Sequence, residues 1–200
     1  PPTPNDDVAS EFYNYDDMLG AKIIASTDVS HCIPRRNWTT GTTYDKYEHN
    51  ISSSNAAASG ATNLFDSSFV VMNSVYAVYK VIDNDGATAS TVEPTGTNPS
   101  VVLTTSDDYK WKFMYTLSAA QQANFLSTDF MAVSPNSNPS SDQSNVISAA
   151  VDGSIDVVKI KTPGSGGTNG TFTGISIKGD GSGGVATVVV GGGLITSVTV

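Results

Sequence analysis

The segment 109–116, YKWKFMYT, constrains the fold of this chain more than any other. Its residues alternate with period two, so that Tyr109, Trp111, Phe113 and Tyr115 fall on one side. Such alternation predicts a β-strand, and each buried aromatic ring removes about 150–250 Å² from water. We therefore expect a strand whose ring-bearing face forms a wall of the core or an interface. Its rings should stabilise packing and take no part in catalysis.

Further elements are expected on both sides of this strand. The segment 74–82, SVYAVYKVI, is apolar on both faces and predicts an inner strand of a sheet. Ser118 and Gln121 have the spacing of a capping box, which predicts a short helix over 119–126 with Ala120, Phe125 and possibly Ala123 facing inward. The run FMAV at 130–133 predicts another strand.

The composition changes after residue 133, which suggests a division of the chain. Segments of six to eight residues follow one another between glycine-rich turns at a spacing of about ten residues, a pattern typical of a small antiparallel β module. The expected strands are 155–161, 171–178, 185–190 and 194–200. The module has few apolar residues, so we expect it to be stabilised by packing against the first domain or against a partner.

The expected fold class is thus α+β and β-rich. It combines an antiparallel or mixed sheet domain with short helices and a small glycine-rich antiparallel β module, which we interpret as an insertion that is incomplete at Val200. The expected organisation is a flexible arm at 1–11, an α+β domain at 12–133, a linker or long loop at 134–145 and the glycine-rich module at 146–200.

The charge balance argues against several classes of function. The net charge is −9, from 19 acidic and 10 basic residues, and such a chain repels phosphate backbones. We therefore expect no nucleic-acid partner. No apolar run approaches the roughly 18 residues that a membrane span requires, so we expect no membrane insertion. The single cysteine, Cys32, excludes an intrachain disulfide framework and fits synthesis in a reducing cytoplasm.

No recognisable catalytic motif is present. The run GDGSGG at 179–184 resembles a serine-protease motif, but Gly181 separates Asp180 from Ser182, so a glycine hairpin is the better interpretation. His31 and Cys32 are neighbours, and neighbours on a strand point to opposite faces, which makes a poor metal site. We expect no enzyme activity, no metal and no cofactor, although a carboxylate pair of a polysaccharide hydrolase would escape sequence analysis.

Three aromatic residues outside the strand allow two interpretations. Trp38, Tyr44 and Tyr47 could form a platform that holds sugars of a host surface, or they could pack an irregular loop onto the sheet. The second interpretation is favoured, so these residues join the four strand aromatics as candidate core or interface positions.

Several blocks resemble a known family in their order and approximate spacing. The chain is similar to a baseplate wedge subunit of T-even-like contractile-tailed bacteriophages over about residues 12–133. STVEPTGT at 90–97, followed by DDYKWKFMYTL at 107–117, is the most specific part. The other blocks are YDDMLGAK (15–22), CIPRRNWTTGTTYDKYEHN (32–50) and VYKVIDNDG (78–86). One departure is Asp107-Asp108, where the family pattern leads us to expect an Asp-Gly turn.

The resemblance implies a non-catalytic structural protein of the virion tail. Proteins of this family form homodimers and contact other baseplate wedge proteins in each of the six wedges around the hub. The chain would then be made in the host bacterial cytoplasm and end in the virion tail baseplate. Two alternatives remain open: a host-surface glycan-binding tail module and a tail-associated polysaccharide hydrolase.

Overall fold

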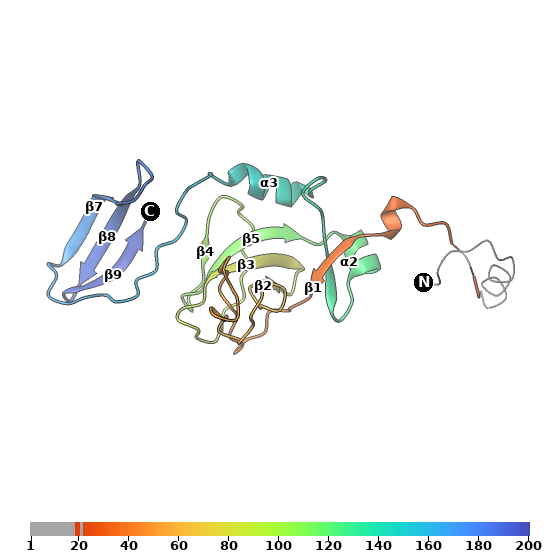
Figure 1. Ribbon diagram of the computed structural model, residues 1–200, viewed down its shortest axis with the longest axis horizontal. Coiled ribbons are helices and arrows are strands. Elements are labelled where there is room, and N and C mark those ends of the chain that lie inside the picture. The colour runs from red at the N-terminus through yellow and green to blue at the C-terminus, as the bar shows by residue number, and fades with distance from the viewer. Residues whose placement is uncertain (1–18, 21) are drawn as a thin grey trace.

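The fold was determined as a computed structural model, which describes residues 19–20 and 22–200. The expected arm at 1–11 and most of the block 15–22 lie outside the described residues. The structure is β-rich, with three antiparallel sheets and short helices, as the sequence predicted (Figure 1). The elements run in the order η1 (Ser26–Asp28), β1 (His31–Pro34), β2 (Val70–Met72), β3 (Ala77–Asp83), β4 (Leu103–Thr104), β5 (Lys110–Thr116), α2 (Ala119–Phe125), β6 (Phe130–Val133), α3 (Ser141–Ala149), β7 (Gly170–Ser176), β8 (Val185–Gly191) and β9 (Leu194–Thr199).

The largest sheet has four strands in the order β2-β3-β5-β4, so β3 is an inner strand as predicted. A smaller sheet pairs β1 with β6, which brings residues about one hundred positions apart into register. The helix α2 begins where the capping box predicted, since the Gln121 N–H donates to Ser118 Oγ at 3.2 Å. Its residues Ala120 and Ala123 are exposed, however, so the inward face predicted for them is wrong; Phe125 is half-buried.

The core comprises two clusters, one on each face of the four-stranded sheet. Tyr79 pairs with Phe113, whereas its neighbour Val78 pairs with Tyr115, so β5 has one extra residue at this point. Consecutive residues of a strand point to opposite faces, and such a bulge reverses the alternation. The first cluster contains Tyr44, Val71, Ala77, Tyr79, Val81, Tyr109, Trp111 and Phe113, and the second contains Met72, Val78, Tyr115, Leu117 and Met131.

This bulge corrects one prediction. Tyr109, Trp111 and Phe113 share a face, but Tyr115 does not share it and packs instead with Met131 of β6. The aromatic strand therefore contributes to both clusters and holds the two sheets of the domain together.

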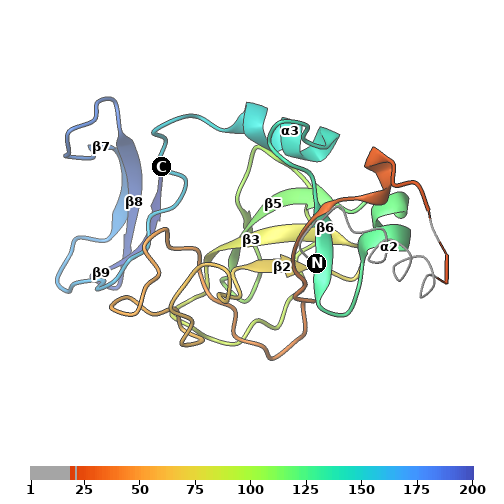
Figure 2. The same cartoon turned by 45° about the vertical axis from the view of Figure 1, so that its right-hand side comes forward.

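The segment between the domain and the glycine-rich module also differs from expectation. The expected linker at 134–145 includes the start of α3, whose N-cap Ser140 forms a second capping box with Gln143. The helix lies over β5, where the Asp142 carboxylate accepts a hydrogen bond from the Thr116 N–H (2.9 Å) (Figure 1). The predicted strand at 155–161 is wrong, because this segment forms no backbone ladder and crosses irregularly to the module (Figure 2).

The other three strands predicted in the module are confirmed as β7, β8 and β9, which form one sheet in that order. We call the irregular segment 150–163 the strap, and residues 164–200 the C-terminal module. The sheet of the module stands apart from the four-stranded sheet, with the strap beside β9 (Figures 1 and 2).

Candidate functional site

The carboxylate of Asp107 connects two loops of the domain. It accepts hydrogen bonds from the backbone N–H groups of Thr91 (2.8 Å) and Val92 (3.0 Å) and from Ser90 Oγ (3.0 Å). The hydroxyl of Thr105, next to the same turn, also donates to it. Burial alone would raise the pKa of Asp107, but these donors outweigh that effect and lower the pKa, so the carboxylate stays ionised.

Asp45 has a similar role in a second group of loops. Its side chain is almost fully buried and accepts four hydrogen bonds, from both the N–H (2.8 Å) and the hydroxyl (2.6 Å) of Ser59, from the Ser67 hydroxyl (3.0 Å) and from the Ser68 N–H (2.8 Å). Burial opposes ionisation, yet these bonds lower the pKa of Asp45 below its ordinary value. A carboxylate saturated in this way is a structural anchor and is unavailable as a catalytic base.

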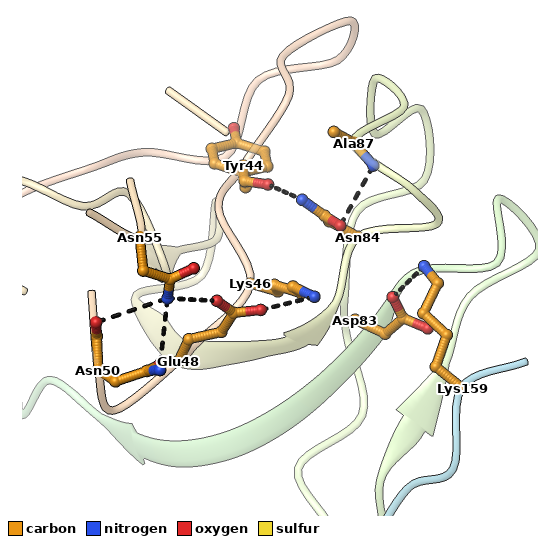
Figure 3. A network of polar contacts seen from close by, with 9 residues as sticks. All are labelled: Tyr44, Lys46, Glu48, Asn50, Asn55, Asp83, Asn84, Ala87 and Lys159. Atoms are coloured by element: carbon orange, nitrogen blue, oxygen red, sulfur yellow. Dashed lines mark hydrogen bonds and ion pairs between the residues drawn. The ribbon is translucent and has the colours of Figure 1, made fainter. Parts of the chain in front are cut away.

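A pocket lined by several charged side chains lies between the loop 46–58, the turn after β3 and the strap. It has a volume of about 610 Å³ and is open to solvent. Figure 3 shows how its polar side chains point toward one another. The side chains that line it include Lys46, Glu48, Ile51, Asn55, Asn84 and Lys159.

Two ion pairs lie at this pocket, whereas Lys161, which also lines it, is in no ion pair among the described residues. Lys46 Nζ lies 2.6 Å from a carboxylate oxygen of Glu48, and Lys159 Nζ lies 2.7 Å from Asp83 Oδ1 (Figure 3). The hydrogen bonds from Lys46 and then Asn55 lower the pKa of Glu48, so it is a poor proton acceptor near neutral pH. The arrangement can hold the strap against β3 through the Lys159–Asp83 pair, but it offers no obvious general acid or base.

The aromatic candidates occupy different environments. Tyr109, Trp111, Phe113, Tyr115 and Tyr44 are each at most 4% exposed. Tyr109 stacks on Trp111, with 5.2 Å between ring centroids, and Tyr44 meets the same indole edge-on at 5.9 Å. These five rings lie in the interior of the chain itself and line no open groove.

The other two aromatic candidates lie nearer the surface. Trp38 is half-buried, packs against the first cluster and donates its indole N–H to Ser90 Oγ at 3.1 Å. Tyr47 is 38% exposed and lies against Phe69, with the Lys80 ammonium 4.5 Å from its ring centroid. Because Tyr44 is buried, the three residues Trp38, Tyr44 and Tyr47 do not together present an exposed platform for a sugar.

The reactive residues considered from the sequence are not brought together. Ser182 lies in the exposed turn between β7 and β8, and His31 and Cys32 are successive exposed residues of β1. Over residues 19–20 and 22–200, no group of three or more His, Cys, Asp or Glu side chains could hold a metal ion. One consecutive carboxylate pair of the sequence, Asp16-Asp17, lies outside the described residues.

Sequence reasoning missed the roles of Asp45 and Asp107. Asp107 was recognised only as a turn residue, and nothing around Asp45 in the sequence indicates that it is buried. The groups that donate to Asp45 lie 14 to 23 positions away from it in the sequence. Those that donate to Asp107 lie 15 to 17 positions away, apart from the nearby Thr105. Only the tertiary structure brings these groups together.

Comparisons with known proteins identify no relative of this chain. No family model matches the chain, and searches of curated proteins and of solved structures found no match either. In the part of the chain that the structure describes, no helix has the length and apolar character needed to cross a membrane.

Proposed function

We propose that this chain is a non-enzymatic structural subunit of a bacteriophage tail baseplate wedge. The observation that carries the proposal is the contact between the two most specific blocks of the family resemblance. The Asp107 carboxylate of block 107–117 accepts hydrogen bonds from three consecutive residues at the start of block 90–97, namely Ser90, Thr91 and Val92. The two blocks that carry the resemblance are thus parts of one structural unit.

Two further blocks, 32–50 and 78–86, extend this unit. The Trp38 indole of block 32–50 donates to Ser90 Oγ, and the Gly41 N–H donates to the Ser90 carbonyl oxygen at 2.7 Å. Asn84, in block 78–86, donates its side-chain amide to the Tyr44 carbonyl oxygen at 2.9 Å (Figure 3).

The chemistry of the described residues favours cohesion over catalysis. The aromatic rings fill the interior, the buried carboxylates hold loops, and the pocket carboxylates pair with lysines. Charged residues are 14% of the chain, against about 25% in typical soluble domains. A surface with few charges loses little solvation free energy when neighbouring subunits cover it in an assembly.

In this role the chain forms a homodimer and contacts other wedge proteins in the tail baseplate of the virion. Its hairpins and loops serve as fixed surfaces for these neighbours, because their backbones are held by internal hydrogen bonds. No cofactor, nucleic acid or membrane takes part in this function.

The proposal is tested on virions of the phage that encodes the chain. Immunogold labelling with antibodies against the purified chain should mark the end of the tail distal to the head, and isolated baseplates should contain the chain. Labelling of the head or neck alone, or absence of the chain from purified particles, would rule out the wedge function. The labelling can be repeated with an epitope tag inserted at exposed Ser182 and an antibody against the tag, because this position is in neither core cluster.

A further inference from the structure

Another pocket lies between β4, β5, the strap and the end of β9. It has a volume of about 520 Å³ and is open to solvent. Lys110 and Lys112 line it from β5, and Asp156 lines it from the strap. The two lysines are two residues apart on one strand, so they share a face of the sheet, with roughly 7 Å between their Cα atoms. Both side chains are half-buried.

The positive charge of these two lysines is not neutralised by the described residues. Neither Lys110 nor Lys112 forms an ion pair in that part of the chain. Asp83 is the partner of Lys110 in the ladder between β3 and β5, but its carboxylate pairs with Lys159 of the strap at 2.7 Å (Figure 3). Asp156, the acidic residue that lines this pocket, is exposed and forms no such pair either.

A third lysine increases the local positive charge. Lys80 of β3 lies directly opposite Lys112 in the ladder, and like charges in such a position destabilise a sheet. Burial, and then repulsion by Lys112, lower the pKa of Lys80, while Asp156 acts in the opposite direction. Three lysines and one carboxylate are thus gathered at one place in a chain whose net charge is −9.

We propose that this pocket binds a phosphate group, either as the free ion or as a phosphomonoester of a small molecule. A phosphate with two negative charges would neutralise Lys110 and Lys112 together and offset the repulsion between Lys112 and Lys80. Lysine ammonium groups bind phosphate as point charges. Ser100 and Thr104 also line the pocket, and their hydroxyl groups supply further hydrogen-bond donors.

The surroundings favour a small dianion over other anions. The net charge of −9 repels an extended polyanion such as a nucleic-acid backbone at long range. A single carboxylate would neutralise only one of the two lysines. The pocket volume of about 520 Å³ exceeds that of a phosphate ion, so there is room for a small group attached to it. This inference does not depend on the baseplate function.

Thermal denaturation in matched buffers tests the site. The wild-type chain is melted at about pH 8, where phosphate is mostly dianionic, in about 20 mM phosphate, acetate or chloride adjusted to equal ionic strength. Phosphate should raise the melting temperature by about 3–7 °C over chloride, which corresponds to a dissociation constant of about 1 mM. Acetate should raise it by less than about 1 °C.

A further ligand distinguishes the two sources of phosphate. Glycerol 3-phosphate at the same concentration has the same charged group with a small organic group attached. A larger rise in melting temperature than with inorganic phosphate would assign the pocket to phosphomonoesters. An equal or smaller rise would assign it to the free ion, and both results support the site.

Lys112→Gln should have opposite effects in the two buffers. In chloride it should raise the melting temperature by about 1–3 °C, because the repulsion with Lys80 is removed. In phosphate it should gain less than about 1 °C over its own value in chloride, because one of the two binding charges is missing. Lys178→Gln is the matched control: Lys178 is exposed between β7 and β8, so this variant should respond to phosphate as the wild type does.

Asp156→Asn distinguishes a phosphate site from an internal ion pair. Without this carboxylate the pocket is more positive, so phosphate should raise the melting temperature at least as much as in the wild type. Three results would overturn the inference: equal rises in phosphate and acetate, an undiminished response to phosphate in Lys112→Gln, or a loss of stability in Asp156→Asn that phosphate does not restore. The last result would mean that Asp156 itself neutralises the lysines.

Discussion

The hydroxyl of Tyr115 donates a hydrogen bond of 2.9 Å to the carbonyl oxygen of Ala132. The bond joins β5 of the four-stranded sheet to β6 of the two-stranded sheet, and both residues are buried. Burial raises the pKa of Tyr115, so the hydroxyl remains protonated and keeps its role as a donor. The bulge in β5 makes this bond possible, because it directs Tyr115 away from the face that contains Phe113.

Tyr115 and Tyr79 form a matched pair for mutation to phenylalanine. Tyr115→Phe removes a buried bond and should lower the free energy of unfolding by about 1–2 kcal/mol. The hydroxyl of Tyr79 is also buried but has no hydrogen-bond partner among the described residues, and burial raises its pKa to about 12. Tyr79→Phe should therefore be neutral or stabilising by up to about 1 kcal/mol. Urea denaturation measures both, and equal losses would contradict this account.

Asp45 should be a major source of stability in the loops. Asp45→Asn removes the charge that four donors surround and turns one acceptor into a donor facing other donors. The free energy of unfolding should fall by about 2–3 kcal/mol. Asp129→Asn is the matched control, because Asp129 is exposed, and it should change stability by less than about 0.5 kcal/mol. Chemical denaturation of both variants distinguishes a buried anchor from a general effect of charge.

The stability of the domain should decline in acid. The pKa values of Asp45 and Asp107 lie below the ordinary 3.8 in the folded chain. A carboxyl group with a lowered folded-state pKa contributes stability that is complete above its unfolded pKa and is lost as the pH falls through the folded pKa. The free energy of unfolding should thus be nearly constant from about pH 7 to pH 5 and decrease below about pH 4.

The same measurement with the double variant Asp45→Asn/Asp107→Asn provides the control. Its stability should be lower at neutral pH and should depend less on pH below about 4, since two of the responsible groups no longer titrate. A pH dependence identical to that of the wild-type chain would show that other carboxylates cause the acid sensitivity.

Asp108 should be replaceable by glycine with a gain in stability. It has φ = 61°, a left-handed conformation that L-residues other than glycine adopt with strain. The turn is closed by bonds of 3.0 Å from the Asp108 N–H to the Thr105 carbonyl and from the Thr105 N–H to the Tyr109 carbonyl. Asp108→Gly should raise the free energy of unfolding by about 0.5–1 kcal/mol, and Asp108→Ala should lower it. Thermal denaturation of the two variants tests the sign, and an alanine variant more stable than the glycine variant would refute it.

Local patterns in the sequence determined most of the regular elements. The alternation in 109–116 and 74–82 is strong enough to specify β5 and β3. The capping box of Ser118 and Gln121 specifies the residue at which α2 begins. The resemblance to a baseplate wedge subunit was also inferred from residues alone and stays a prediction. Ser140 and Gln143 form the same capping box before α3, and their spacing in the sequence is the same local signal.

Only the tertiary structure decided which side chains meet. The face of Tyr115 depends on a bulge, and a bulge is defined by the partner strand, which no local pattern contains. The segment 155–161 has the composition of a strand but no neighbouring edge with which it forms a ladder, and its Lys159 pairs instead with Asp83. The burial of Asp45 likewise depends on serines brought in from distant loops. Periodicity specifies a local backbone state, whereas pairing register and hydrogen-bond partners arise from contacts between residues far apart in the chain.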